Sequence, residues 1–260
     1  MSVSDKFYIQ SINRALLIVD IIAKSGDAGL SLTALAEKSG LPVSTVYRIL
    51  ENLISWQYIL EDEFGFYKLG FELITLGSIA GNNINLKNIA HPHIAKLGEL
   101  TRETVYLAVL DEDNACAIYI DKIESKGNIK LAAGIGSRNR IHSTANGKIL
   151  VSGLKNERIR ELLSTAGMPA LTESTITDTD TFLDEIDKVR TQGYAIDDIE
   201  NEPGVRCVAA PILDDKNRIV GSVSLSGISS SVTLELIHLK YKFLIMETAQ
   251  TISKNLGRKD

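Results

Sequence analysis

Cysteines, long apolar runs and a charged leader are scarce or absent in this 260-residue chain. Two cysteines, Cys116 and Cys207, are too few for a disulfide framework or a zinc ribbon, which fits a reducing compartment. No apolar run approaches the ~18 residues needed to span a membrane, and the first residues lack a basic start followed by an apolar block. We therefore expect a cytoplasmic protein with no membrane segment and no signal peptide.

Metal-binding patterns and internal repeats are also missing. The sequence has no H-x-x-x-H or C-x-x-C pair, and the acids between Asp197 and Glu202 lack the spacing of a calcium loop. We expect no metal and no cofactor. The composition is 44% hydrophobic and 23% charged, which is typical of a soluble globular protein, and the length allows two domains with separate cores.

The stretch from Ser31 to Leu60 predicts two short helices joined by a tight turn. Ser31 can cap the first helix, Gly40 can supply the left-handed residue that ends it, and Pro42 presets the backbone for the second. In the second helix the apolar side chains recur at helical spacing and face a core: Val46, Ile49, Leu50 and Leu53. This pattern predicts a helix-turn-helix, whose second helix enters the major groove of DNA.

A helical hairpin alone is also common in protein cores, so the residues that follow decide the interpretation. Two strand-like runs, Tyr58–Leu60 and Phe66–Leu69, flank the turn residues 61–65. A β-hairpin directly after the second helix is typical of a winged helix. We therefore predict a winged helix-turn-helix DNA-binding domain over residues 1–69.

The second helix and the wing would meet double-stranded operator DNA. Arg48 is the candidate for reading a guanine edge, because a bidentate Arg–guanine pair supplies ~1–3 kcal/mol of discrimination. The full predicted DNA-binding set is Ser44, Thr45, Tyr47, Arg48, Asn52 and Lys68. Residues 1–70 nevertheless hold six basic and eight acidic residues, so one copy gains little from phosphate neutralisation. This balance leaves open a protein-interaction module that packs on a partner instead of DNA.

The remaining chain predicts a linker and a second domain. Residues 70–87 predict a linker helix whose apolar surplus either pairs with another chain or packs on its own domain. Residues 88–260 predict a domain with a helix from His91 to Glu103, a helix capped by Asp180 and a long final helix around 237–252. Strands are expected at 105–110, 115–123, 129–133, 194–196, 205–213 and 219–225. Helices placed before, within and after several hairpins indicate an α+β fold on a mainly antiparallel sheet.

Polar residues gather in three segments of this second domain. Ser222, Ser224 and Ser226 lie on one face of their strand, because strand side chains alternate with a period of two. Beside Cys207 and a helix start near Ala145, they would form a small polar pocket whose free helix N–H groups favour a carboxylate. A solvated sheet face explains the serines equally well.

Several motifs resemble those of one known family. They are IQSINRALLIVDII at 9–22, GLPVSTVYRILENL at 40–53, HSTANGK at 142–148, GYAIDDIENEPGVRCVAAPIL at 193–213 and IVGSVSLSG at 219–227. In this order they resemble the IclR family of bacterial transcription regulators, over about Ile9 to Leu256. The resemblance implies a winged helix-turn-helix, a linker helix and a GAF-like C-terminal domain that binds a small effector, usually an organic acid. It also implies a homodimer or tetramer that regulates transcription, which we interpret as a repressor and not an enzyme.

Carried over by motif, the resemblance implies an effector pocket formed by Leu131, Ala145, Asn146, Asp197, Cys207, Ser224 and Ser226. Family members often have a small residue where Asn146 stands. Because Asn adds a donor and an acceptor, we expect a ligand other than the simplest keto acids. An enzyme that uses Cys207 is the alternative, with His142 as the nearest candidate base, although no full set of nucleophile, base and orienting residue is visible.

Overall fold

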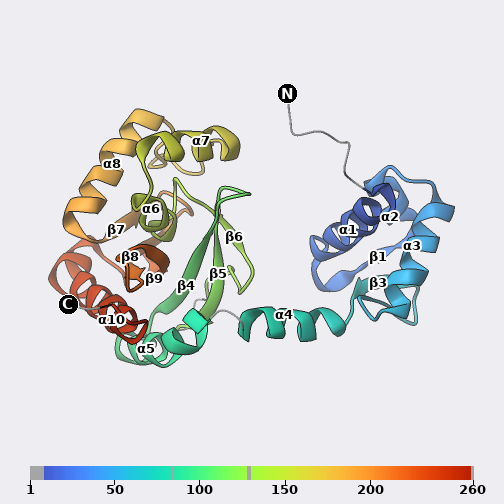
Figure 1. The fold of residues 1–260 in the computed structure, drawn as a ribbon, viewed down its shortest axis with the longest axis horizontal. Helices are drawn as coiled ribbons and strands as arrows, with labels where there is room; N and C mark the ends of the chain where they lie inside the picture. The colour runs from blue at the N-terminus through green and yellow to red at the C-terminus, as the bar shows by residue number, and fades with distance from the viewer. Residues whose placement is uncertain (1–8, 83–84, 128–129, 259–260) are drawn as a thin grey trace. The chain divides into compact units, whose positions relative to one another are not determined.

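The computed structural model describes residues 9–82, 85–127 and 130–258, which form two compact units that divide at residues 83 and 84 (Figure 1). The first unit contains α1 (Gln10–Ala23), the short 3₁₀ turn η2 (Gly26–Ala28), α2 (Leu32–Ser39) and α3 (Val43–Ser55). Its antiparallel sheet has the order β1-β3-β2, from β1 (Leu30–Ser31), β2 (Ile59–Glu61) and β3 (Phe66–Leu69). Helix α4 (Glu72–Asn82) follows the wing. This arrangement confirms the predicted winged helix-turn-helix.

Local sequence signals determine the turn between α2 and α3. The Ser31 hydroxyl accepts a hydrogen bond from the backbone N–H of Ala34 at 3.4 Å, and Gly40 has a φ of 67°. A left-handed residue of this kind costs glycine little, because glycine has no Cβ. Pro42 immediately precedes α3. A core of side chains from all three helices and the sheet then fixes the orientation of α3: Ile18, Ile22, Leu35, Ala36, Val46, Leu50, Ile59 and Tyr67.

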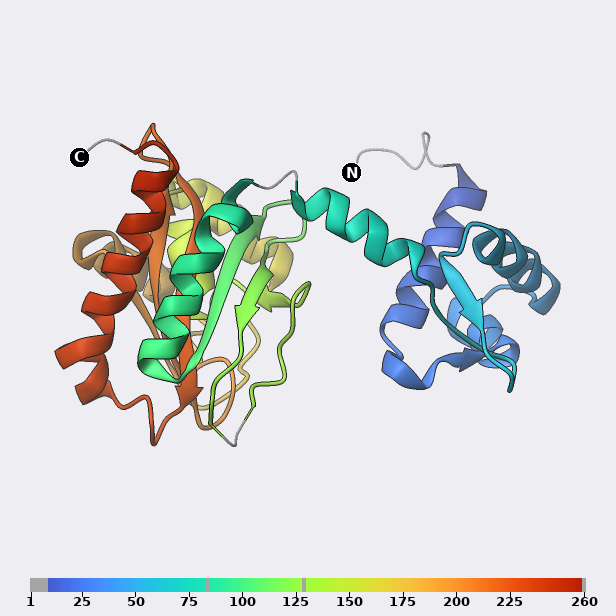
Figure 2. The ribbon, with the colours of Figure 1, turned by 90° about the horizontal axis from the view of Figure 1, so that it is seen from below.

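The second unit is built on a six-stranded antiparallel sheet with the order β6-β5-β4-β9-β8-β7. Its strands are β4 (Thr104–Asp111), β5 (Cys116–Ile123), β6 (Arg138–Arg140), β7 (Ala195–Asp198), β8 (Val205–Leu213) and β9 (Ile219–Ile228). Helices α5 (Asn85–Thr101) and α10 (Lys242–Asn255) lie along one face of the sheet (Figure 2). The short α9 (Leu234–Leu236) and the π-helical turn η3 (Ile237–Tyr241) lead into α10.

The opposite face of the sheet carries α6 (Ala145–Ser152), with α8 (Thr179–Gln192) and α7 (Asn156–Ala166) packed outside it (Figure 1). Strands β8 and β9 alternate between the two faces. Val208 and Val223 belong to the apolar core under α5 and α10, whereas Ala209 packs with residues of α6 on the other side. Mixed helices and an antiparallel sheet confirm the α+β prediction. Within the described ranges, no helix is long and apolar enough to cross a membrane.

The predicted start of the first helix in this unit was wrong. We expected His91 because proline lacks an N–H and its ring crowds the carbonyl four residues earlier. The helix α5 instead begins at Asn85 and carries Pro92 in its interior. Burial of Leu86 and Ala90 on the sheet, upstream of the proline, explains why the helix extends past it.

Two further local predictions were also wrong. Residues 130–133 do not form a strand, and Ile129 lies outside the described residues; the edge strand is β6, where Cys116 pairs with Arg140. Leu131 and Ala133 instead pack against a cluster that contains the Tyr106 and Tyr119 rings. The cap of α8 is Asp178, whose carboxylate accepts from the Thr181 N–H at 2.8 Å, so Asp180 lies in the first turn.

Candidate DNA-binding surface and effector pocket

Helix α3 turns one face inward and leaves the other free. Val46 and Leu50 are fully buried, whereas Ser44, Tyr47 and Arg48 are exposed. Asn52 is also exposed, and its amide donates to the Arg48 carbonyl at 2.8 Å. Thr45 is half-buried. The surface predicted to meet DNA is therefore accessible in this unit.

A groove between α1 and α3 adds a residue that the sequence reasoning missed. Its volume is about 460 Å³, and its lining residues are Ser11, Arg14, Ala15, Thr45, Arg48, Ile49, Asn52 and Leu53. Arg14 and Arg48 are the arginines among residues 1–83, and they reach the same groove from different helices. Nothing in the sequence around Arg14 indicates this role, because the groove forms only when α1 packs beside α3.

The wing presents a mixed surface. Phe64 at its tip is 76% exposed. The ammonium of Lys68 lies 2.9 Å from the Asp62 carboxylate, and this contact, with backbone N–H donors, lowers the pKa of Asp62. Lys68 would therefore have to exchange an existing ion pair for a phosphate, which weakens its value as a DNA contact.

In the second unit, the seven residues predicted for the pocket surround one small cavity, here called the inner cavity. Its volume is about 40 Å³, and it is lined by Tyr106, Tyr119, Leu131, Ala133, Asn139, Thr144, Ala145, Asn146, Asp197, Asn201, Glu202, Val205, Cys207, Ser224 and Ser226. Because a water needs roughly 10–15 Å³ of such volume, the cavity as it stands holds a few waters or a carboxylate-sized group. The two tyrosine rings stack at 4.2 Å on one wall.

Asn146 organises the polar end of the inner cavity. Its amide nitrogen donates to the Ser224 hydroxyl at 2.8 Å, and its carbonyl accepts from the Ser222 hydroxyl at 2.7 Å. Ser224 therefore keeps its own proton for another acceptor. Thr144 caps α6 by accepting from the Gly147 N–H at 3.0 Å. Ala145 and Asn146, the first residues of α6, line the cavity, and the unpaired N–H groups of a helix's first turn give that end a partial positive charge.

A row of paired residues crosses the sheet beneath this cavity. Asp197 on β7 pairs with Cys207 on β8, which pairs with Ser226 on β9. Burial raises the pKa of Asp197 to about 7, against the lowering effect of the Glu200 backbone N–H. Burial also raises the pKa of the Cys207 thiol well above its usual value. Asp197 is therefore protonated below about pH 7, and in that state the row carries no negative charge that would repel an anion.

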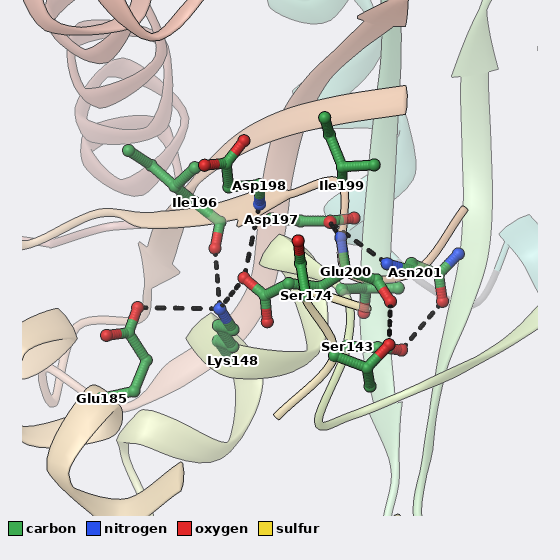
Figure 3. A network of polar contacts seen from close by, with 12 residues as sticks. Ser143, Lys148, Ser174, Glu185, Ile196, Asp197, Asp198, Ile199, Glu200 and Asn201 are labelled. Carbon is green, nitrogen blue, oxygen red and sulfur yellow. Dashed lines mark hydrogen bonds and ion pairs between the residues drawn. The ribbon is translucent and has the colours of Figure 1, made fainter. Parts of the chain in front are cut away.

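A buried lysine ties α6 to the segment after β7, as Figure 3 shows. Lys148 is 1% exposed. Its ammonium donates to the Ile196 carbonyl at 2.8 Å and to the Glu200 carboxylate at 2.6 Å, with Glu185 3.6 Å away. In the sequence, Lys148 of the HSTANGK motif cannot be distinguished from a surface lysine, because its bonding partners lie far away along the chain.

The segment that Lys148 holds has a strained backbone. Ile199 has a φ of 61°, which is a rare conformation for a β-branched residue. Asp197 accepts from the Glu200 N–H at 2.7 Å, and Thr172 and Thr175 donate to the carbonyls of Ile199 and Glu200 at 2.7 and 2.6 Å. These bonds hold the strained turn in one conformation and thereby fix the Asp197 carboxyl at the cavity.

The geometry does not supply a base for Cys207. Its raised pKa keeps the thiol protonated, whereas a nucleophile needs the thiolate. The His142 ring contacts the Pro169 carbonyl at 3.2 Å, and burial lowers the pKa of this histidine. Among the described residues that line the inner cavity there is no histidine.

Comparison with known proteins identifies the family. A model of the bacterial transcriptional regulator IclR C-terminal domain matches residues 80–254, and a model of the IclR helix-turn-helix domain matches residues 11–63. The chain belongs to the IclR family. It is therefore a DNA-binding transcription regulator and not an enzyme, as the sequence motifs predicted.

Relatives cover both units of this IclR-family chain. It is 34% identical to the HTH-type transcriptional regulator KdgR of Dickeya chrysanthemi, over 96% of this chain and 82% of that protein. It is 30% identical to the transcriptional repressor IclR of Escherichia coli K12, over 96% and 90% of the two chains. The crystal structure of Thermotoga maritima IclR has a TM-score of 0.78 at 32% identity, and the match covers 96% of this chain and all of that one.

Proposed function

We propose that this regulator is a repressor whose operator affinity is changed by a small organic acid bound in the inner cavity. The main support for this proposal is that one chain combines an exposed α3 surface with a buried polar cavity. The expected organisation is a DNA-binding domain over residues 1–69, a linker helix over 70–87 and an effector domain over 88–260, working in the cytoplasm. A relative described as an acetate operon repressor, from Salmonella typhimurium, is 34% identical and supports repression.

An acid is the ligand class that the cavity chemistry favours. The start of α6, the free proton of Ser224 and an Asp197 whose raised pKa of about 7 keeps it protonated below that pH are all suited to a carboxylate. None of the described lining residues is a lysine or arginine, so neutral donors would hold the charge. An IclR homologue from Microbacterium hydrocarbonoxydans, which is 18% identical, has been crystallised with 4-hydroxybenzoate; here that structure supports the fold alone.

On the DNA side, Arg48 and Tyr47 would read bases, and Ser44, Thr45, Asn52 and Lys68 would hold or approach the backbone. Arg14 joins the set as a phosphate contact, because it shares the α1–α3 groove with Arg48. Two copies are needed, because residues 1–70 are not basic overall. A homodimer or tetramer would place recognition helices about one duplex turn, ~34 Å, apart.

Exposed apolar side chains on α4, and on Phe71 immediately before it, support self-association. Phe71 and Ile74 are 70% and 69% exposed, and Ile79 is also exposed. Several exposed apolar side chains within one short segment are typical of an interaction site.

Selection from a random duplex library, with the purified full chain, tests the DNA part of the proposal. We expect enrichment of a two-fold symmetric site. The selected site is then titrated in the presence of organic acids, and at least one acid should change the affinity. Enrichment of no sequence over the starting pool would contradict the proposal.

A further inference from the structure

A second hollow lies directly beside the inner cavity. This outer hollow has a volume of about 300 Å³ and is lined by Arg102, Glu103, Thr104, Ser125, Gly127, Leu131, Ser226, Gly227, Ile228 and Ser231. Leu131 and Ser226 line both spaces, so they form the wall between them. The inner cavity is the size of one small polar group, whereas the outer hollow reaches the range of ordinary ligand sites, roughly 300–1,000 Å³.

The sheet register carries the polar row of the inner cavity into the outer hollow. Asp197, Cys207 and Ser226 are paired across β7, β8 and β9, and Ser226 in turn pairs with Thr104 on β4. Directly paired residues of antiparallel strands have their side chains on the same face of the sheet. Thr104 is therefore the fourth member of a row whose other three members line the inner cavity.

Thr104 is the member of this row with an unmet hydrogen-bonding capacity. Its residue is 1% exposed, and its hydroxyl has no hydrogen-bond partner among the described residues. Buried polar groups in native proteins are bonded in the large majority of cases, so an orphaned hydroxyl that borders a hollow points to a missing partner. A hydroxyl can both donate and accept, which suits another hydroxyl.

We propose that the effector site continues past Ser226 into the outer hollow, and that it takes an unbranched hydroxy acid of about five or six carbons. This inference rests on the proposed function, because the carboxylate is held at the start of α6 by Ser224. A ligand hydroxyl bonds Thr104, and Leu131 covers the middle of the carbon chain. Further ligand hydroxyls would accept hydrogen bonds from the Arg102 guanidinium and donate to the Glu103 carboxylate, since both residues line the hollow.

The distance between Ser224 and Thr104 determines the length of the ligand that can reach both residues. Ser224 is the diagonal neighbour of Thr104 across β4 and β9, because Thr104 pairs with Ser226. Diagonal neighbours lie about 7–8 Å apart. An extended chain advances ~1.2 Å per covalent bond, as the rise of an extended backbone shows. About six bonds therefore join a carboxylate at Ser224 to a hydroxyl oxygen at Thr104.

Calorimetric titration of the full chain with four acids tests the proposal. Lactate is short, D-gluconate and D-galactonate have six carbons with hydroxyls, and hexanoate has the same length without them. We expect at least one six-carbon hydroxy acid to bind at least tenfold more tightly than lactate and hexanoate. Thr104→Val keeps the shape but removes the hydroxyl, so it should weaken that acid about tenfold, leave lactate unchanged and be reversed in Thr104→Ser.

The control is Thr248→Val, since that hydroxyl donates to the Leu244 carbonyl on α10, outside both spaces. It should leave all affinities unchanged. If lactate binds as tightly as both six-carbon hydroxy acids, or if Thr104→Val binds them like the unaltered chain, the extension is wrong while the proposed function stands. If none of the four acids binds, both the extension and the acid chemistry of the proposed function are wrong.

Discussion

The two units of this chain use opposite means to bind their ligands. In the N-terminal unit the candidate groups are exposed, and Arg48 and Asn52 lie on a free helix face. In the C-terminal unit they are buried, and Asn146 is already bonded to two serines, whereas the Thr104 hydroxyl still lacks a partner. A surface site can wait for DNA in water, whereas a buried site must be satisfied internally, because an unpaired buried polar group costs ~1–3 kcal/mol. Substitutions should therefore affect binding in the first unit and stability as well as binding in the second.

The largest effect is expected at the buried lysine. Lys148→Met should destabilise the protein by ~3–5 kcal/mol, because it leaves the Glu200 carboxylate buried without its cation. Urea unfolding followed by far-UV circular dichroism measures the change. Lys188→Met is the matched control, since its ammonium is exposed and lies 3.5 Å from Glu185. Equal stability of the two variants would show that the Lys148 network is dispensable.

The next effect concerns pH. The pKa of Asp197 is about 7 in the folded chain, above an unfolded value near 4, so the folded state binds the extra proton. The stability this supplies is complete below pH ~4 and is lost as the pH rises to ~7. Binding of the organic acid in the inner cavity should likewise weaken above pH 7, by up to tenfold per pH unit, because Asp197 ionises there. Calorimetry from pH 6 to 9 measures it, and Asp197→Asn should remove the dependence; an unaltered slope in that variant would refute the assignment.

Substitutions of the two arginines on the DNA-binding surface should lower DNA affinity in two different ways. Arg48→Ala should cost ~1–3 kcal/mol on the selected site and relax the preference at one base pair. Arg14→Ala should weaken all duplexes alike and reduce the slope of log affinity against log salt by about one. Fluorescence anisotropy at several salt concentrations separates these outcomes. If Arg14→Ala weakens binding to only some DNA sequences, or if Arg48→Ala keeps the original base-pair preference, the roles assigned to these two arginines are wrong.

A smaller effect is expected at the wing. Lys68→Ala should reduce DNA affinity less than Arg14→Ala, because Lys68 must first give up Asp62. The same anisotropy titration compares them. If Lys68→Ala is the weaker binder of the two, the ion pair with Asp62 does not persist near DNA.

The α4 surface bears on how two copies meet. Ile74→Asn should lower the association constant of the full chain, since it places an amide in the proposed apolar interface. Sedimentation equilibrium measures the constant, with Glu72→Gln as the control on the same helix. A variant that associates as strongly as the unaltered chain would exclude Ile74 from the interface.

The two units also differ in how far the sequence predicted them. In the first unit, the cap at Ser31 and the left-handed Gly40 are local signals, and the structure confirmed the helix-turn-helix they predicted. In the second, strand periodicity correctly put Ser222, Ser224 and Ser226 on one face, and the structure places them on the α6 side of the sheet. Their roles in ligand binding stay predictions.

Long-range contacts account for what the sequence did not predict. Lys148 and Glu200 are 52 positions apart, and nothing near either residue marks the pair. The α5 helix passes through Pro92 because the sheet buries the turn before it, which overrides the local preference. Arg14 becomes a candidate only when α1 packs beside α3. In each case tertiary packing supplies information that no window of neighbouring residues contains.

The affinity of the full chain for its selected duplex, with and without a saturating acid, tests most directly whether the C-terminal unit controls DNA binding. The acid should be whichever of lactate, D-gluconate and D-galactonate binds most tightly. We expect a change of about 5- to 150-fold, the range expected for coupled sites, and its loss in Asn146→Ala. An affinity that stays the same when the acid is bound would contradict the claim that the C-terminal unit controls the DNA-binding unit.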